Sequence, residues 1–322
     1  MIRLAAALLL AAGSIGAAPS PAATSPDAAA LATLQRDDHR FQSLGWRLAT
    51  ANAPYCAHAA PAIGLLLQDM RAYGDPARMR RAAGIEGDIA VEAVAAGSPA
   101  EAAGLSPNDE IIAVDGAAIA SFPSDSAAPW QRGVTLQERI EAAMARDGHV
   151  TIDWRARDGQ LHSKVIAGVP ACPTRWELHE SGDDALAEGT RVVIGRDHPT
   201  FAYADDELAA LMAHELAHNI FRHRDWLNAH GRKQRDIRRT EREADRLMPW
   251  LLANAGFDPA AAARWMRHWG PKHDGGILRK RDHEGWDERL EAIEAEIPLV
   301  RAAMAQTGRA DWKAGFRRDI AP

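Results

Sequence analysis

Beyond its first two dozen residues, the sequence lacks any apolar run near the roughly 20 residues that a bilayer-spanning helix needs. It also lacks an excess of basic residues, because 38 lysines and arginines stand against 44 aspartates and glutamates, for a net charge of -6. We therefore expect no integral membrane segment after residue 23 and no nucleic-acid partner. What remains is a globular composition, 47% hydrophobic and 25% charged, and 322 residues are enough for two domains.

The first 23 residues have the layout of a secretory signal peptide. One positive charge at Arg3 precedes the short apolar core "LAAALLLAA", and small residues follow it. The alternative, a membrane-anchoring helix, needs a longer apolar run. We predict cleavage between residues 17 and 23, without a lipid anchor because no cysteine lies there. The protein is thus expected to be periplasmic or secreted.

Cysteine is scarce, with Cys56 and Cys172 as the two examples in the chain. The periplasm and the extracellular space oxidise thiols, so an even count in an exported protein indicates one disulfide between these residues. Two free, buried thiols are the alternative. A disulfide would clamp the base of everything between the two cysteines, and in the chain-entropy model a loop of this length stabilises by on the order of 4 to 5 kcal/mol.

The sequence between the cysteines changes character part-way. Residues 24–78 begin with the Ala- and Leu-rich stretch 26–51, which predicts an N-terminal helical segment packed on the C-terminal body. Residues 79–169 consist of short β-branched runs divided by turns. Within them, "SPAEAAGL" predicts a helix start, with Ser98 as N-cap and Glu101 completing a capping box.

The stretch "GSPAEAAGLSPNDEIIAVDGAAI" resembles the PDZ domains found in bacterial protease systems. The resemblance covers residues 79–169, and it implies a small β-barrel inserted into the rest of the chain. The open strand edge of such a domain can accept an extended peptide as an additional strand. A purely structural spacer is the alternative.

Residues 170–322 predict an α+β body in which helices dominate. Two strand patterns, "RWELHE" and "TRVVIG", come first, and helical patterns follow. One of these begins at Asp205 and Asp206. It continues through "ELAALMAHELAHNIFRH" without Gly or Pro, which predicts one unbroken helix.

Two histidines four residues apart lie within this helix. His214 and His218 share one helix face, so each can give a ring nitrogen to a single zinc ion. Glu215 projects about 100° away, near the metal but not on it, where it can take a proton from water. A helix that has this histidine spacing by chance is the alternative.

A third ligand is available in "TEREADRLM". Glu241 and Asp245 lie one turn apart on one helix face, whereas Glu243 projects toward the opposite side. We therefore predict Glu241 as a metal ligand and Asp245 as the acceptor for the ring N–H of a ligand histidine. A solvated, charged helix is the alternative. His223 and His230, between the two motifs, are predicted not to bind the metal.

"HELAH" followed by "EREAD" resembles the HtpX-like family of zinc metallopeptidases, which includes the CaaX prenyl proteases and soluble periplasmic proteases. The resemblance covers residues 173–297. The sequence has no counterpart of the membrane-spanning helices of that family. The resemblance implies a zincin-type fold, one zinc ion per chain and Glu241 as the third ligand. It also assigns oxyanion stabilisation to His283, and it assigns Arg289 to holding Asp245 or lining the site.

Two positions depart from the pattern of this family. Glu284 follows His283 where the family usually has proline, which leaves the shape of that loop open. Asp184 stands where asparagine is usual, in the segment "DALAEGTRVVIG" ahead of the motif helix. A strand there could hold a substrate backbone by edge pairing.

The expected function is that of a secreted zinc endopeptidase acting on unfolded or misfolded envelope proteins, with the PDZ domain binding substrate. Glu215 is the expected general base, and the substrate class comes from the resemblance alone. A peptide-binding or chaperone-like module with an inactive zinc site is the alternative from a different class. An exopeptidase has no support, since no feature of the sequence would anchor a substrate terminus.

Overall fold

The computed structural model describes residues 25–123, 127–273 and 285–320. The predicted signal peptide at residues 1–23 and the predicted oxyanion residue His283 lie outside the described residues. None of the helices in the described part of the chain combines the length and apolar character that a bilayer crossing requires.

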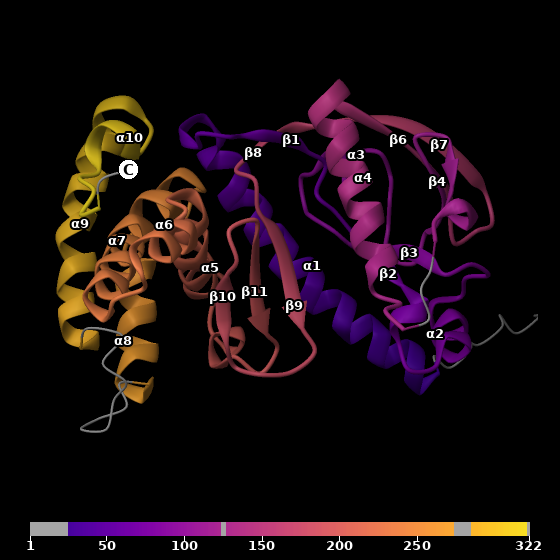
Figure 1. The fold of residues 1–322 in the computed structure, drawn as a ribbon, viewed down its shortest axis with the longest axis horizontal. Coiled ribbons are helices and arrows are strands. Elements are labelled where there is room, and N and C mark those ends of the chain that lie inside the picture. The colour runs from indigo at the N-terminus through magenta and orange to yellow at the C-terminus, as the bar shows by residue number, and fades with distance from the viewer. Residues whose placement is uncertain (1–24, 124–126, 274–284, 321–322) are drawn as a thin grey trace, which may run out of the picture.

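The first helix, α1 (Pro26–Asn52), runs beside both halves of the molecule (Figure 1). The side chain of Ser25 caps it, and the predicted helix at 26–51 is confirmed. Near its start Leu31 is buried in a small cluster with Met70, and further on Phe41 and Leu48 enter the large C-terminal core. A single helix therefore contributes to the cores on either side of it.

A six-stranded antiparallel sheet forms the half of the molecule that lies between the cysteines. The strand order is β2-β3-β4-β6-β7, with β5 beside β4. Helix α4 packs on this sheet through Leu136, Ile140 and Met144, and the side chain of Ser98 caps α3 as predicted. The strands are β2 (Leu65–Asp69), β3 (Ile89–Val94), β4 (Glu110–Val114), β5 (Ala117–Ala118), β6 (His149–Arg155) and β7 (Leu161–Ala167), and the helices are α2 (Pro76–Ala83), α3 (Pro99–Ala102) and α4 (Gln131–Asp147).

This sheet begins earlier in the chain than residue 79. Strand β2 pairs with β3, so residues 65–69, which the sequence placed in the helical segment 24–78, belong to the sheet. The reason is that "LLLQD" begins with a short apolar run, and periodicity alone cannot tell whether such a run forms a buried strand or a buried helix. Pairing with β3 decides between them, and that contact is not visible in the sequence.

The two ends of this half meet at one point. Strand β1 (Ala60–Ala62) pairs antiparallel with β8 (Val169–Ala171), and Ala62 lies opposite Val169. Next to this pair the predicted disulfide is present, joining Cys56 to Cys172 with a Cα–Cα distance of 5.5 Å. The chain thus leaves the end of α1 and returns to it at one place, where the disulfide and the β1–β8 pair hold the two crossing segments together.

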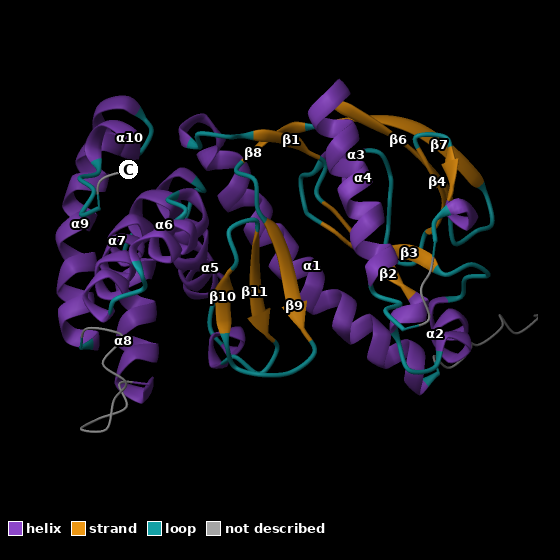
Figure 2. Cartoon of the chain, in the orientation of Figure 1, coloured by secondary structure: helices purple, strands orange, loops and turns teal. Residues whose placement is uncertain are grey.

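The C-terminal half combines a small sheet with helices (Figure 2). Its strand order is β10-β11-β9, with β11 parallel to β9 and antiparallel to β10. The chain as a whole is α+β with helices dominant, as predicted. The strands are β9 (Arg175–His179), β10 (Ala185–Ala187) and β11 (Arg191–Gly195), and the helices are α5 (Asp205–Ile220), α6 (His223–His230), α7 (Gln234–Asn254), α8 (Ala261–His273), α9 (Trp286–Thr307) and α10 (Trp312–Gly315).

Helix α5 lies at the centre of this half and is buried over most of its length. Helices α7 and α8 pack against it, and α1 contacts both α5 and α7. The close approach of α1 to β9 requires a glycine, because a Cβ at Gly45 would overlap the ring of Trp176. The chemistry-bearing residues of α5 are therefore held on a rigid element inside the core.

Candidate metal centre

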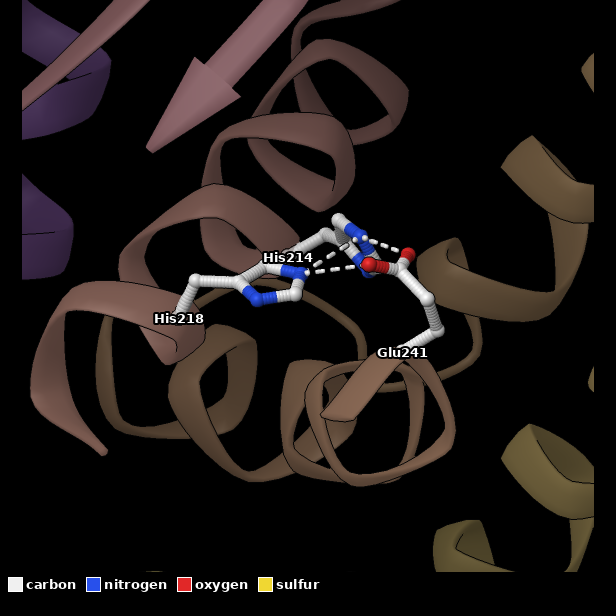
Figure 3. Close-up of side chains that lie close together, drawn as sticks. All are labelled: His214, His218 and Glu241. Carbon is white, nitrogen blue, oxygen red and sulfur yellow. Dashed lines mark hydrogen bonds and ion pairs between the residues drawn. The ribbon is translucent and has the colours of Figure 1, made fainter. Parts of the chain in front are cut away.

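His214 and His218 lie one turn apart on α5 and turn the same ring nitrogen toward a common point (Figure 3). The two Nε2 atoms are 3.2 Å apart. Both side chains are largely buried, with 7% and 13% of their surface exposed. Since neutral imidazole binds a metal through one nitrogen, this arrangement presents two ligand atoms to one ion.

Glu241 reaches the same point from α7 (Figure 3). Its Oε2 lies 3.3 Å from Nε2 of His214, and its Oε1 lies 3.5 Å from Nε2 of His218. Ligand atoms about 2.0–2.2 Å from a tetrahedral zinc ion stand about 3.3–3.6 Å from one another. The three side chains therefore have the spacing of a metal site, and all their ligand atoms lie within 4.8 Å of one another.

Asp245 stands one turn beyond Glu241 and is fully buried. Its Oδ1 lies 3.0 Å from Nδ1 of His214, the ring nitrogen that faces away from the common point. Burial lowers the pKa of His214, but Asp245 and Glu241 outweigh it and raise that pKa to about 10. Burial dominates at the other ring and lowers the pKa of His218 to about 3 despite Glu241, so the two carboxylates act mainly on His214.

Glu215 follows His214 on α5 and is buried to 8% exposure. Its charge acts on Arg289: burial lowers the pKa of that guanidinium, but Asp245, Glu241 and Glu215 together raise it above its ordinary value. Glu215 is therefore close to the charged groups of the centre without being one of the three converging ligands.

Glu243 and His223 contact each other, and the sequence does not indicate this contact. Glu243 does project away from the centre, yet it is fully buried rather than solvated, and its Oε2 lies 2.9 Å from Nε2 of His223. Nδ1 of His223 in turn lies 3.0 Å from Nδ1 of His218. His223 therefore contacts a predicted ligand from behind, a role that the sequence did not indicate.

The cause is a break between α5 and α6. Helix α5 ends at Ile220 rather than continuing to His223, because Arg222 adopts a left-handed conformation with φ 53°. This turn brings His223 back against His218. No Gly or Pro marks the position, so the sequence gives no local signal for it. His230 is exposed, and its Nδ1 contacts the carbonyl oxygen of Trp226, away from the centre.

Comparison with known protein families assigns one part of the chain to a family. Residues 90–128 match the PDZ domain family. The match runs from β3 to the segment before α4, so this part of the chain is a PDZ domain, and this type of domain indicates peptide or protein binding. The search of curated proteins and the search of solved structures each gave no match. The resemblance of the C-terminal half to a peptidase family accordingly stays a prediction.

Proposed function

We propose that the chain is a zinc-dependent endopeptidase whose PDZ domain binds the polypeptide substrate. The observation that carries this proposal is the convergence of His214, His218 and Glu241 at tetrahedral spacing inside a buried helix pair. Two nitrogens and one carboxylate are the ligand set of catalytic zinc sites that keep one position open for water or substrate. Calcium and magnesium favour oxygen ligands, so this set supports zinc over either.

A bound zinc ion would act as a Lewis acid that lowers the pKa of a bound water molecule toward neutral pH and polarises a carbonyl group. Every other step falls to the side chains of the protein. His214 and His218 hold their rings with Nε2 inward, and Asp245 lies 3.0 Å behind the first ring, where it would hold that ring in place by accepting the hydrogen of Nδ1. Glu215 would take a proton from the attacking water and return it to the leaving amine. The resemblance gives oxyanion stabilisation to His283, and this assignment stays a prediction.

The small sheet supports a substrate bound as an extended chain. Strand β10 pairs with β11 on one side, and no other strand in the described residues pairs with its outer edge. This strand also packs against α5. A substrate segment could add to that edge through backbone hydrogen bonds, which read little sequence. We therefore propose unfolded or misfolded polypeptides as the substrate class and cleavage within the chain rather than at its ends.

We also propose that the protein acts in the periplasm or outside the cell. The signal-peptide pattern of residues 1–23 supports this. The disulfide supports it independently, since such bonds persist in oxidising compartments. Envelope proteins that have lost their fold are then the substrates within reach.

Glu215→Gln separates catalysis from metal binding and is the test. The variant should keep zinc near one ion per chain, because all three ligands remain, and it should lose hydrolysis of casein and of an end-blocked peptide by more than about 100-fold. Glu291→Gln, at an exposed position of α9, is the matched control and should behave as wild type. Retained activity in Glu215→Gln would assign the base to another residue.

A peptide-binding or chaperone-like protein with an inactive zinc site is the second candidate. The PDZ match favours it, because peptide binding is the function that this domain type indicates. The same experiment separates the two functions. Wild-type protein that contains zinc and suppresses aggregation of an unfolded substrate, but cleaves neither casein nor the blocked peptide, would select the second candidate.

A further inference from the structure

A series of polar contacts supports the His218 ring on the side away from the metal centre, and it ends at residues 318–320, far away in the sequence. Its Nε2 faces the metal centre, and its Nδ1 lies 3.0 Å from Nδ1 of His223. Nε2 of His223 lies 2.9 Å from Oε2 of Glu243. The side chains of His223 and Glu243 are 1% and 0% exposed, so water does not compete for either contact.

The carboxylate of Glu243 determines which atom donates and which accepts in each of these hydrogen bonds. An ionised carboxylate only accepts hydrogen bonds, so Nε2 of His223 must carry the hydrogen and donate it. Nδ1 of a neutral His223 is then the accepting nitrogen, and Nδ1 of His218 must be the donor. With its hydrogen fixed on Nδ1, His218 keeps the lone pair of Nε2 free for a metal. One tautomer satisfies every contact.

The C-terminal segment holds Glu243 in its ionised, buried state. Arg318 donates from Nε to Oε1 at 3.1 Å and from Nη2 to Oε2 at 2.9 Å. The backbone N–H groups of Asp319 and Ile320 also donate to Oε1, at 2.8 and 3.2 Å. The guanidinium of Arg318 lies 4.0 Å above the ring of Phe221, directly after α5. The end of the chain thus closes the contact path that begins at His218.

We propose that His223 and Glu243 are positioning residues for the metal ligand His218, and that residues 318–320 complete this positioning relay. The other ligand histidine has a counterpart, in which Asp245 faces His214 and Arg289 holds Asp245. Each histidine therefore has a carboxylate and an arginine behind it, and on the His218 side an additional imidazole spans the distance. The inference rests on the proposed metal site but not on the reaction that occurs there.

The test measures zinc affinity of the full-length metal-free protein by competition with a chromophoric chelator. Glu243→Gln should weaken zinc binding by about 10–100-fold, the usual effect of losing an outer hydrogen-bond partner that orients a ligand histidine, here through His223. Phe316→Ala is the matched control, because Phe316 is buried in the same C-terminal packing, against Phe221 and Arg246, but its side chain can form no hydrogen bond with the relay. It should lower the melting temperature and leave zinc affinity unchanged.

Two further variants keep the test decisive if Glu243→Gln does not fold. His223→Gln retains an amide that can accept from His218 and donate to Glu243, whereas His223→Leu retains neither function. The positioning role predicts tighter zinc binding in His223→Gln than in His223→Leu. Arg318→Met should weaken binding in the same direction through Glu243.

Equal zinc affinity in His223→Gln and His223→Leu would overturn the relay, as would unchanged affinity in Glu243→Gln or an equal loss in Phe316→Ala. Wild-type protein that binds zinc without hydrolysing any substrate would overturn the proposed endopeptidase and leave the relay standing. Wild-type protein that binds no zinc would overturn both.

Discussion

Arg289 holds Asp245 through two parallel hydrogen bonds, from Nε to Oδ2 at 2.7 Å and from Nη2 to Oδ1 at 2.8 Å. Both side chains are buried, and the pair joins α9 to α7 directly behind His214. Burial would raise the pKa of Asp245, but Arg289 and His214 hold it below its ordinary value. The carboxylate that faces the candidate metal ligand is therefore kept ionised by a residue on another helix.

Replacing Arg289 with Met should destabilise the fold strongly, because it leaves Asp245 as a buried charge without its main partner. The expected loss is about 3–5 kcal/mol in the free energy of unfolding, measured by urea denaturation. Arg301→Met is the control on the same helix. Arg301 is 61% exposed and pairs with Asp258 at 3.4 Å, so its loss should cost less than about 1 kcal/mol. Similar losses in the two variants would contradict a special role for the Arg289–Asp245 pair.

Glu241→Gln should lose zinc far more completely than any relay variant. The change removes a predicted ligand itself, so the decrease in affinity should exceed the about 10–100-fold expected when a ligand loses only its hydrogen-bond partner. Metal content after dialysis and a chelator titration measure this. Glu291→Gln, at an exposed position of α9, serves as the control again. Near-stoichiometric zinc in Glu241→Gln would place the third ligand elsewhere.

The paired strands at the base allow the PDZ-containing half to be removed cleanly. Because Ala62 lies opposite Val169 in an antiparallel pair, replacing residues 63–168 with Asn-Gly would join β1 and β8 as a two-residue hairpin. The disulfide and the three predicted ligands would remain. Leu31 loses its cover in this variant and should be changed to Gln at the same time.

This shortened protein should cleave short blocked peptides within about twofold of wild type, since such peptides would reach only the proposed metal centre. Cleavage of unfolded proteins should fall by about tenfold or more, because a second grip raises the effective concentration of a long substrate. Rates for both substrate types, with the single change Leu31→Gln as control, measure the difference. Loss or acceleration of both activities would instead make the PDZ-containing half a structural or inhibitory element.

Stability should depend on pH through Glu92, which is buried on β3 beside Asp38 of α1 and Arg196 after β11. Burial, together with the charge of Asp38, raises the pKa of Glu92 to about 9. The folded protein therefore retains a proton that the unfolded chain releases near its ordinary pKa of 4.5. Stability from this group is complete below that pH and is lost as the pH rises toward about 9.

Urea unfolding at several pH values between about 6 and 8 measures this effect. Wild type should lose on the order of 1 kcal/mol per pH unit from this group, and Glu92→Gln should remove that slope. Tyr73 also faces these groups, and burial raises its pKa above its ordinary value, so it does not titrate in this interval. Identical slopes in Glu92→Gln and wild type would show that Glu92 is already ionised at neutral pH.

Local sequence rules were sufficient where one element determines the outcome. The helical face that Glu241 and Asp245 share is a property of α7 alone, and the structure directs both side chains toward His214. The helix at 26–51 and the cap at Ser98 likewise depend on short-range signals. The Cys56–Cys172 pairing followed from the cysteine count and the expected compartment.

The same rules failed where a distant segment decides the environment. Glu243 projects away from Asp245 as expected, but residues 318–320 pack there, so the opposite side of the helix is not solvent. On a continuous helix His223 would lie about 140° around from His218. The left-handed residue Arg222 turns the chain so that His223 faces His218. Neither this turn nor the packing of residues 318–320 on Glu243 can be recognised from composition or periodicity.

The disulfide has a consequence for survival among proteases. Its cysteines are separated by 116 positions, and the segment they enclose includes the whole PDZ domain. A cut anywhere within that loop leaves two polypeptides that remain one covalent molecule. Nicked protein would therefore migrate as two fragments only after reduction, and the helices that bear the three ligands would keep their hold on α1.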